Sequence, residues 1–144
     1  MAPIDSLARK PQAAAEPAFR SPPHNIEAEQ ALLGAILINN EAFYRVSDFL
    51  ESKHFFEPIH AEIFDLAGRL IHLSKRADPI SLKGHLAERD IEGLSVSQYL
   101  ARLVAEATTI INAQDYGRIV YFLAVRRALI EIGEDIVNLS LIHI

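Results

Sequence analysis

From Asn25 onward, hydrophobic residues recur every three or four positions, the spacing that places them on one face of an α-helix. Residues that favour helix starts stand just before these stretches: Asn25, Pro58, Asp78 with Pro79, and the pair Ser95 and Gln98, which has the spacing of a capping box. No run alternates apolar and polar residues in the manner of a strand. The pattern predicts an all-α fold, in which a small multi-helix head is followed by one long helix.

The last predicted helix begins near Asn112 and continues to about Leu139, a length of roughly 40 Å. Along it, apolar residues alternate at spacings of three and four, the pattern of a coiled-coil seam. We call the following set the association seam: Phe122, Val125, Leu129, Ile132, Ile136 and Leu139. A separate row, Tyr116, Val120 and Leu123, suits packing on the preceding helices. Because large exposed apolar patches are rare on monomers, we expect another subunit, or a continuation of the natural chain, to cover the seam.

The chain divides into four parts by composition. Residues 1–24 hold five of the seven prolines and show no apolar period, which predicts a disordered Pro/Ala-rich arm, with a docking peptide as the alternative. Residues 25–107 form the predicted helical head, residues 108–139 the long helix, and residues 140–144 a short tail. The total length of 144 residues fits one ordinary domain.

The composition excludes several classes of protein. The chain has no cysteine, so a disulfide scaffold, a thiolate zinc site and a cysteine nucleophile are all excluded. Its formal net charge is −5, from 14 Lys and Arg against 19 Asp and Glu, which argues against DNA binding by this chain alone. Neither a signal peptide nor an apolar stretch of about 20 residues is present, so we expect a cytoplasmic, soluble protein without a membrane partner.

No catalytic, cofactor-binding or metal site is predicted for this chain. None of the six glycines is followed by lysine, so the P-loop of ATPases is absent, as is the Gly-x-Ser-x-Gly motif of esterases. Glu57 and His60 have the Glu-x-x-His spacing of di-metal bundles, but that chemistry needs two such pairs and further glutamates. A helical metal-binding enzyme is therefore a minor alternative, and we expect His60 to pack or hydrogen-bond at the edge of the head. The pair Arg126 and Arg127 predicts a solvated face or an inter-helix salt bridge.

Five segments of the chain, each rich in helix-core residues, carry a family resemblance. They are residues 23–35 (PHNIEAEQALLGA); Phe55-Phe56 with His60 and Ile63-Phe64; residues 78–82 (DPISL) with Leu86; Tyr99-Leu100 with Leu103, Asn112 and Tyr116; and residues 126–130 (RRALI). In this order they resemble the N-terminal domain of bacterial replicative DNA helicases of the DnaB family. The resemblance covers roughly residues 22–137.

The resemblance implies an architecture and a role. In this family a helical head precedes a two-helix hairpin, hairpins pair between subunits, and the domains form a collar on a hexameric ring at which primase docks. A RecA-like motor domain elsewhere in the family protein binds ATP and Mg²⁺ and drives the helicase along DNA. The association seam would then face the second limb of the hairpin or a neighbouring subunit. We expect a non-catalytic collar domain of the primosome, with further copies of itself and primase as partners and a helicase loader as a further candidate.

The chain also departs from the family pattern. Residues 138–144 do not resemble the turn into the second limb, so we expect the chain to stop before that limb and the motor domain, with a non-native tail at residues 140–144. Only one glycine, Gly93, precedes Tyr99-Leu100, where the family often has two. A stand-alone helical adaptor that only resembles the helicase head is the alternative interpretation. The sequence leaves the oligomer number and the primase-contact residues open.

Overall fold

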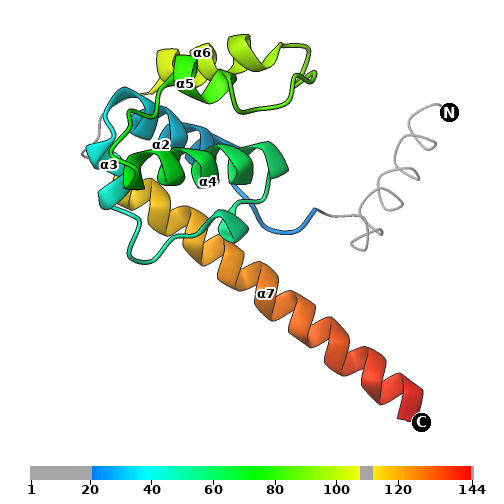
Figure 1. Cartoon of the computed structure of the whole chain (residues 1–144). Helices are drawn as coiled ribbons and strands as arrows, with labels where there is room; N and C mark the ends of the chain where they lie inside the picture. Colours follow the sequence, from blue (N-terminus) through cyan, green and yellow to red (C-terminus); the bar gives the residue numbers. More distant parts are fainter. Residues whose placement is uncertain (1–20, 108–111, 144) are drawn as a thin grey trace, which may run out of the picture.

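The computed structural model describes residues 21–107 and 112–143, and these residues form an all-α fold (Figure 1). Most of the predicted arm at residues 1–24 lies outside the described residues, as do residues 108–111 and Ile144. Within the described ranges there is no β-strand, and the extended pairing there is a single antiparallel bridge between Ile91 and Leu94. The predicted all-α class is confirmed.

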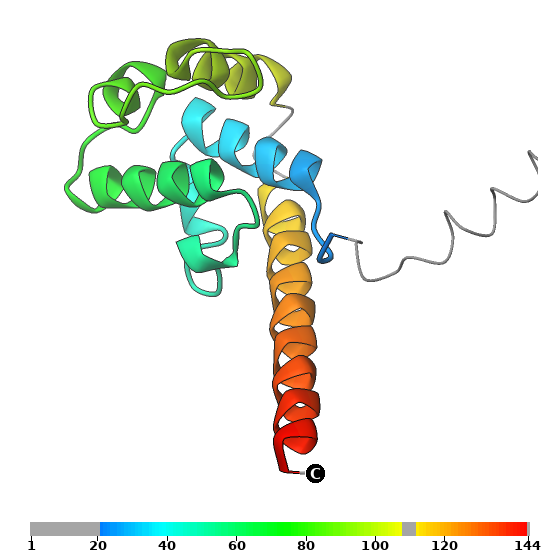
Figure 2. The same cartoon turned by 90° about the vertical axis from the view of Figure 1, so that its right-hand side faces the viewer.

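The described chain forms six α-helices and one 3₁₀ turn. In order these are α2 (Ile26–Ile38), α3 (Glu41–Tyr44), the 3₁₀ turn η2 (Ser52–His54), α4 (Pro58–His72), α5 (Pro79–Lys83), α6 (Val96–Glu106) and α7 (Ala113–His143). Helix α2 contacts α4, α6 and α7, so it is the central helix of the head. Helix α7 begins against the head and then projects away from it as a single rod (Figures 1 and 2).

The helix starts follow the predicted capping residues. The Asn25 side chain caps α2, and Asp78 caps α5 with Pro79 at the first helical position. Ser95 and Gln98 form the predicted capping box at the start of α6. These side chains satisfy backbone N–H groups that have no partner inside the helix, so the order of short helices in the head is fixed largely by local sequence.

Two glycines allow elements of the head to approach closely. A Cβ atom at Gly34 of α2 would overlap the backbone carbonyl oxygen of Leu103 in α6. A Cβ atom at Gly117 of α7 would lie 2.5 Å from Cγ1 of Val46. Neither neighbour can move aside cheaply, because one is backbone and the other is a fully buried branched side chain. The glycines therefore set how α6 and the beginning of α7 lie on the rest of the head.

Helix α7 extends further than the sequence pattern predicts. The prediction ended the helix near Leu139, whereas the helix spans Ala113–His143 and includes residues 140–143 of the predicted tail. No glycine or proline stands after Gly133, so nothing in the covalent chain interrupts helical geometry there. The exposed rod is correspondingly longer.

Candidate functional site

The association seam lies on the part of α7 that projects from the head (Figure 2). Its six side chains share one face of the helix, because their spacing follows the helical period. All six are exposed, from 37% for Val125 to 62% for Phe122. From Ala128 to Ile142 every residue of α7 is exposed, so no described part of the chain covers the last four seam residues. Val125, nearer the head, borders a groove that Lys53 and His54 also line.

Two members of the row predicted to pack on the head do so: Val120 is buried in the core, and Tyr116 is half-buried against it. Leu123 is half-buried. This row lies at the start of α7, where the seam also begins. Helix α7 therefore has a proximal part that belongs to the head and a distal part that is free on all sides within the described structure.

A second exposed apolar row on α7 was missed by the sequence reasoning. It comprises Ile119, Ile130, Val137 and Leu141, with exposed fractions between 39% and 66%. The row lies about 100° around the helix from Leu129, given 3.6 residues per turn. Its spacings of eleven, seven and four residues fit the helical period and could have revealed the row in the sequence. The spacing of the association seam is more regular and drew the prediction to the other face. The distal part of α7 is thus apolar on two sides.

Arg127 joins α7 to two loops of the head. Its Nη1 donates to the carbonyl oxygen of Pro23 at 2.8 Å, and its Nη2 donates to the carbonyl oxygen of His54 at 2.7 Å. Its guanidinium also lies over the ring of Phe56, 5.5 Å from the centroid. The prediction for the pair Arg126 and Arg127 was therefore wrong for Arg127, which forms neither a salt bridge nor part of a solvated face, because its partners are neutral backbone carbonyls and a ring.

An aromatic stack extends this contact toward the first residues of the described chain. The imidazole of His24 lies parallel to the Phe56 ring, with centroids 4.0 Å apart and an interplanar angle of 7°. The Phe56 ring thus contacts both an imidazole and a guanidinium. Desolvation lowers the pKa of the Arg127 guanidinium from its ordinary value, and the charge of Glu29 acts in the opposite direction.

A buried polar network joins α2, α4 and α6. Nδ1 of His60 lies 2.7 Å from Oε1 of Glu29, and Nε2 of His60 lies 2.6 Å from the hydroxyl oxygen of Tyr99. The Tyr99 hydroxyl also accepts a hydrogen bond from Nε2 of Gln30 at 3.2 Å. Because a carboxylate has no proton to donate, Nδ1 donates to Glu29, and Nε2 can accept from Tyr99. Oε2 of Glu29 accepts from the backbone N–H of Phe56 at 2.7 Å.

The sequence analysis did not predict the two central residues of this network. His60 was expected at the edge of the head, but it is completely buried. Glu29 was not singled out, yet only 2% of it is exposed. A signal was available, because Glu29 stands at helical spacing with Leu32, Leu33 and Ile36, all of which are buried. An acidic residue on the apolar face of a helix needs a buried partner.

The same geometry bears on the metal-binding alternative. Both ring nitrogens of His60 already have hydrogen-bond partners within the head. In residues 21–107 and 112–143, no three His, Asp or Glu side chains are grouped so that they could hold a metal ion. The buried side-chain nitrogen and oxygen atoms of these ranges all have hydrogen-bond partners. The network therefore links α2, α4 and α6 through hydrogen bonds that are satisfied within the head.

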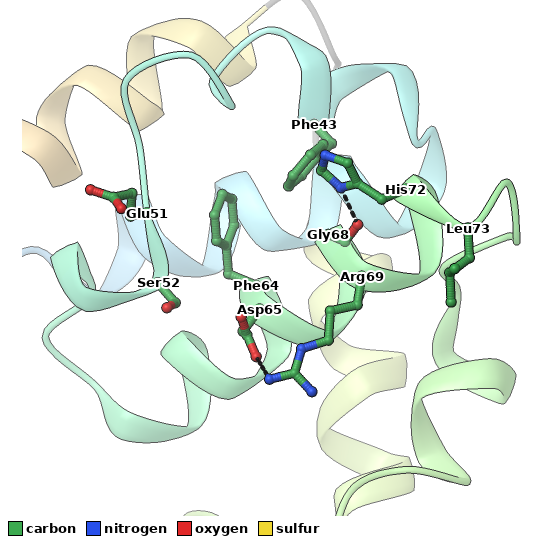
Figure 3. Close-up of a pocket in the computed structure, with 9 residues that line it drawn as sticks. All are labelled: Phe43, Glu51, Ser52, Phe64, Asp65, Gly68, Arg69, His72 and Leu73. Atoms are coloured by element: carbon green, nitrogen blue, oxygen red, sulfur yellow. Dashed lines mark hydrogen bonds and ion pairs between the residues drawn. The ribbon is translucent and has the colours of Figure 1, made fainter.

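A pocket of about 560 Å³ opens on the head beside α4 (Figure 3). The rings of Phe43 and Phe64 lie at its apolar side, and Asp65 and Arg69 form an ion pair of 2.7 Å at its rim. His72 closes another side, with its Nδ1 2.6 Å from the carbonyl oxygen of Gly68. Each charged side chain of this ion pair has its partner within the rim, so the pocket presents no concentrated charge.

No helix in the described part of the chain is both long enough and apolar enough to cross a membrane. Charged residues interrupt the apolar rows of α7 between Arg126 and Asp135, for example Glu131, Glu134 and Asp135. This composition is that of a helix whose apolar sides meet protein and whose other side meets water.

Comparison with known proteins finds a consistent group of relatives. The model of the DnaB-like helicase N-terminal domain family matches residues 21–122. A replicative DNA helicase DnaB from Rickettsia typhi is 48% identical over 120 residues, which are 81% of this chain and 24% of the relative. The corresponding helicase from Treponema pallidum is 36% identical over 118 residues, covering 80% of this chain and 26% of the relative. The chain thus spans about a quarter of the length of these curated relatives.

A solved structure shows the same fold. The crystal structure of the N-terminal domain of DnaB helicase from Mycobacterium tuberculosis superposes with a TM-score of 0.72 at 28% sequence identity. The superposition covers 82% of this chain and 86% of that chain. The similarity therefore extends over nearly the whole of the solved domain and includes most of the described residues.

Proposed function

We propose a function on the premise that this chain belongs to the DnaB-like helicase N-terminal domain family. In this proposal the chain acts as the collar domain of a replicative DNA helicase. It does so by associating with further copies of itself through α7. The relatives are named as replicative DNA helicases, and the chain corresponds to their N-terminal region. The role is structural in this proposal: the domain holds subunits together during DNA replication.

The observation that carries the proposal is the uncovered seam. Six apolar side chains on one face of α7 are exposed, and no described residue covers the four of them beyond Arg127. Burying such a side chain fully is worth roughly 1.5–3 kcal/mol, so completing the burial of half-exposed ones yields about 1 kcal/mol each. For six side chains on each of two chains the sum is about 12 kcal/mol, which is of the same order as the roughly 4–15 kcal/mol that association costs in lost freedom. Pairing of α7 with α7 of a second copy is the simplest way to gain it.

Leu129→Asp tests this proposal. An aspartate in the middle of the seam would bring an unpaired charge into an apolar contact, which costs several kcal/mol. Asn138→Asp is the matched control, because residue 138 lies half a turn around the helix from residue 129 and is also exposed. Sedimentation velocity over a range of concentrations measures the mass, and circular dichroism shows whether the head stays folded.

We expect the unmodified chain to exceed the monomer mass and to dissociate on dilution. Leu129→Asp should remain a folded monomer, and Asn138→Asp should behave like the unmodified chain. A monomer mass for the unmodified chain at every concentration would contradict the proposal. An unchanged mass for Leu129→Asp would contradict the choice of face.

Docking of primase is a second role that we propose for the head, on the basis of the family alone. A helicase loader is a further candidate partner on the same basis. No head residue is assigned to either contact. Co-elution of the purified chain with the primase of the same organism tests the role. Leu129→Asp should still bind primase if docking uses the head, and loss of binding in that variant would place the contact on α7.

ATP-driven unwinding of DNA we assign to the larger part of the relatives, which this chain does not span. The chain lacks a P-loop motif and carries a net charge of −5, which support this division. ATP and Mg²⁺ are accordingly proposed as cofactors of that other part, and the cytoplasm as the site of action. The purified chain should neither hydrolyse ATP nor retard DNA in a gel, and hydrolysis that persists through repurification would contradict the assignment.

A further inference from the structure

We infer that Arg127 is a positioning residue that fixes the direction of α7 relative to the head. Arg127 is the last half-buried residue of α7 before a run from Ala128 to Ile142 in which every residue is exposed. Ala128 and Glu131 still border the groove beside η2, but among the described residues of α7 Arg127 is the one farthest along the helix that hydrogen-bonds to the head. A contact at that place has more control over the angle of the rod than any contact closer to its start.

The bonding of Arg127 suits this role. Its two terminal nitrogens reach carbonyl oxygens in two separate segments, Pro23 ahead of α2 and His54 at the end of η2. Bonds from a charged donor at 2.7–2.8 Å are stronger than those between neutral groups. The planar guanidinium fixes the directions of both bonds and lies on the Phe56 ring, which a lysine could not reproduce.

Apolar packing alone does not hold α7 at this place. A groove of about 400 Å³ lies between η2 and α7 next to the Arg127 contact. Its lining includes Tyr121, Ala124 and Ala128 on the helix, and Lys53 and His54 on the turn. The two alanines leave the groove unfilled, so the helix has room to tilt toward the turn. The hydrogen bonds of Arg127 span this gap and fix the distance between the helix and the turn.

The length of the free rod makes the angle important. From Arg127 to His143 the helix extends about 24 Å, and a tilt of roughly 10° would move its end by about 4 Å. If α7 pairs with a second copy as proposed above, the angle determines where the two heads lie. That consequence rests on the proposed function, whereas the positioning of α7 within one chain does not.

Distance measurement between two spin labels tests the inference. The chain has no cysteine, so labels can be attached at Lys83→Cys in α5 and Asn138→Cys in α7 without other changes. Labelled protein is mixed with an excess of unlabelled protein, so that only distances within one chain contribute. Arg127→Ala, Arg127→Lys and the matched control Arg126→Ala are compared by double electron–electron resonance. Arg126 is exposed, and the described structure shows no hydrogen bond or ion pair for it.

We expect one narrow distance maximum for the unmodified chain and for Arg126→Ala. Arg127→Ala should lose the single maximum and give a broad distribution, while its melting temperature changes little. Arg127→Lys should also broaden the distribution, because a single ammonium group cannot keep both bonds and the ring contact. A single unchanged maximum in folded Arg127→Ala would overturn the inference. Should Arg127→Ala fail to unfold cooperatively, Arg127→Lys decides by the same criterion. The mass of the unmodified chain tests the proposed function separately.

Discussion

Replacing Glu29 by alanine is the sharpest test of how the head is held together. Glu29 and His60 are the charged or polar residues that are buried among those the structure describes. The Glu29 carboxylate accepts from Nδ1 of His60 and from two backbone N–H groups, those of Phe56 at 2.7 Å and Glu57 at 3.4 Å. Glu29→Ala would leave these donors in the interior without an acceptor. It would also detach the start of α4 from α2.

The expected loss in the free energy of unfolding follows from the number of buried donors that would lose their acceptor. A buried donor that loses its acceptor costs about 1–3 kcal/mol, and breaking a buried ionic or hydrogen-bonded pair by removing one partner costs about 3–5 kcal/mol. We therefore expect Glu29→Ala to lower the free energy of unfolding by about 3–5 kcal/mol. A domain of this size has about 5–15 kcal/mol in total, so the variant should be close to its limit of stability.

Glu27→Ala is the matched control for this experiment. Glu27 and Glu29 both lie in the first turn of α2, but Glu27 is exposed. Removing a carboxylate from the first turn weakens its interaction with the helix dipole by about 0.3–1 kcal/mol in either variant. Urea denaturation with linear extrapolation measures both. If the two variants lose the same free energy, the buried network does not stabilise the head and the reasoning fails.

Two further predictions concern glycines of α2 and α7 and a histidine of the head. Gly34→Ala should destabilise the chain by about 1–3 kcal/mol, because its Cβ would overlap the Leu103 carbonyl. Gly133→Ala, on the open part of α7, should stabilise the chain by about 0.5–1 kcal/mol. Equal melting temperatures for the two variants would contradict the close contact at Gly34. His54 accepts from the Glu51 backbone N–H at 2.9 Å, and desolvation lowers the pKa of His54 from its ordinary 6.5. The contribution of His54 to stability is thus present above pH 6.5 and is lost as the pH falls through the lowered pKa. His54→Gln should therefore reduce the loss of unfolding free energy on the acid side, as measured by urea denaturation at several pH values. Parallel pH profiles for the variant and the unmodified chain would contradict this prediction.

Local features of the fold were predictable because their causes are local. Asn25, Asp78 and the pair Ser95 and Gln98 cap helices within three residues of themselves, so their effect can be read directly from the chain. The association seam was likewise visible from spacing alone. Whether it joins copies of the chain stays a prediction. Contacts that depend on segments far apart in the sequence could not be read in this way.

Glu29 and Arg127 show why the remaining contacts were missed. An acidic residue in the first turn of a helix already has a local explanation in the helix dipole, so the pattern gave no reason to bring Glu29 together with His60, 31 residues away. Arg127 binds backbone carbonyls, which every residue carries and which leave no mark in the sequence. Side chains that pair with side chains can be guessed from complementary types, whereas those that pair with backbone cannot.

The head and the distal part of α7 differ in where their polar and apolar groups lie. The head has a polar network at its centre, where α2, α4 and α6 meet, and every described buried polar side-chain atom there has a partner. Helix α7 shows the reverse arrangement, with apolar rows outside and exposed on two sides. The distal part of α7 continues a helix whose first turns already pack on the head, so it needs no nucleus of its own. Its apolar rows nevertheless stay exposed, and covering them would stabilise the rod further. Association through α7, as proposed above, would therefore bury the rod without altering the head.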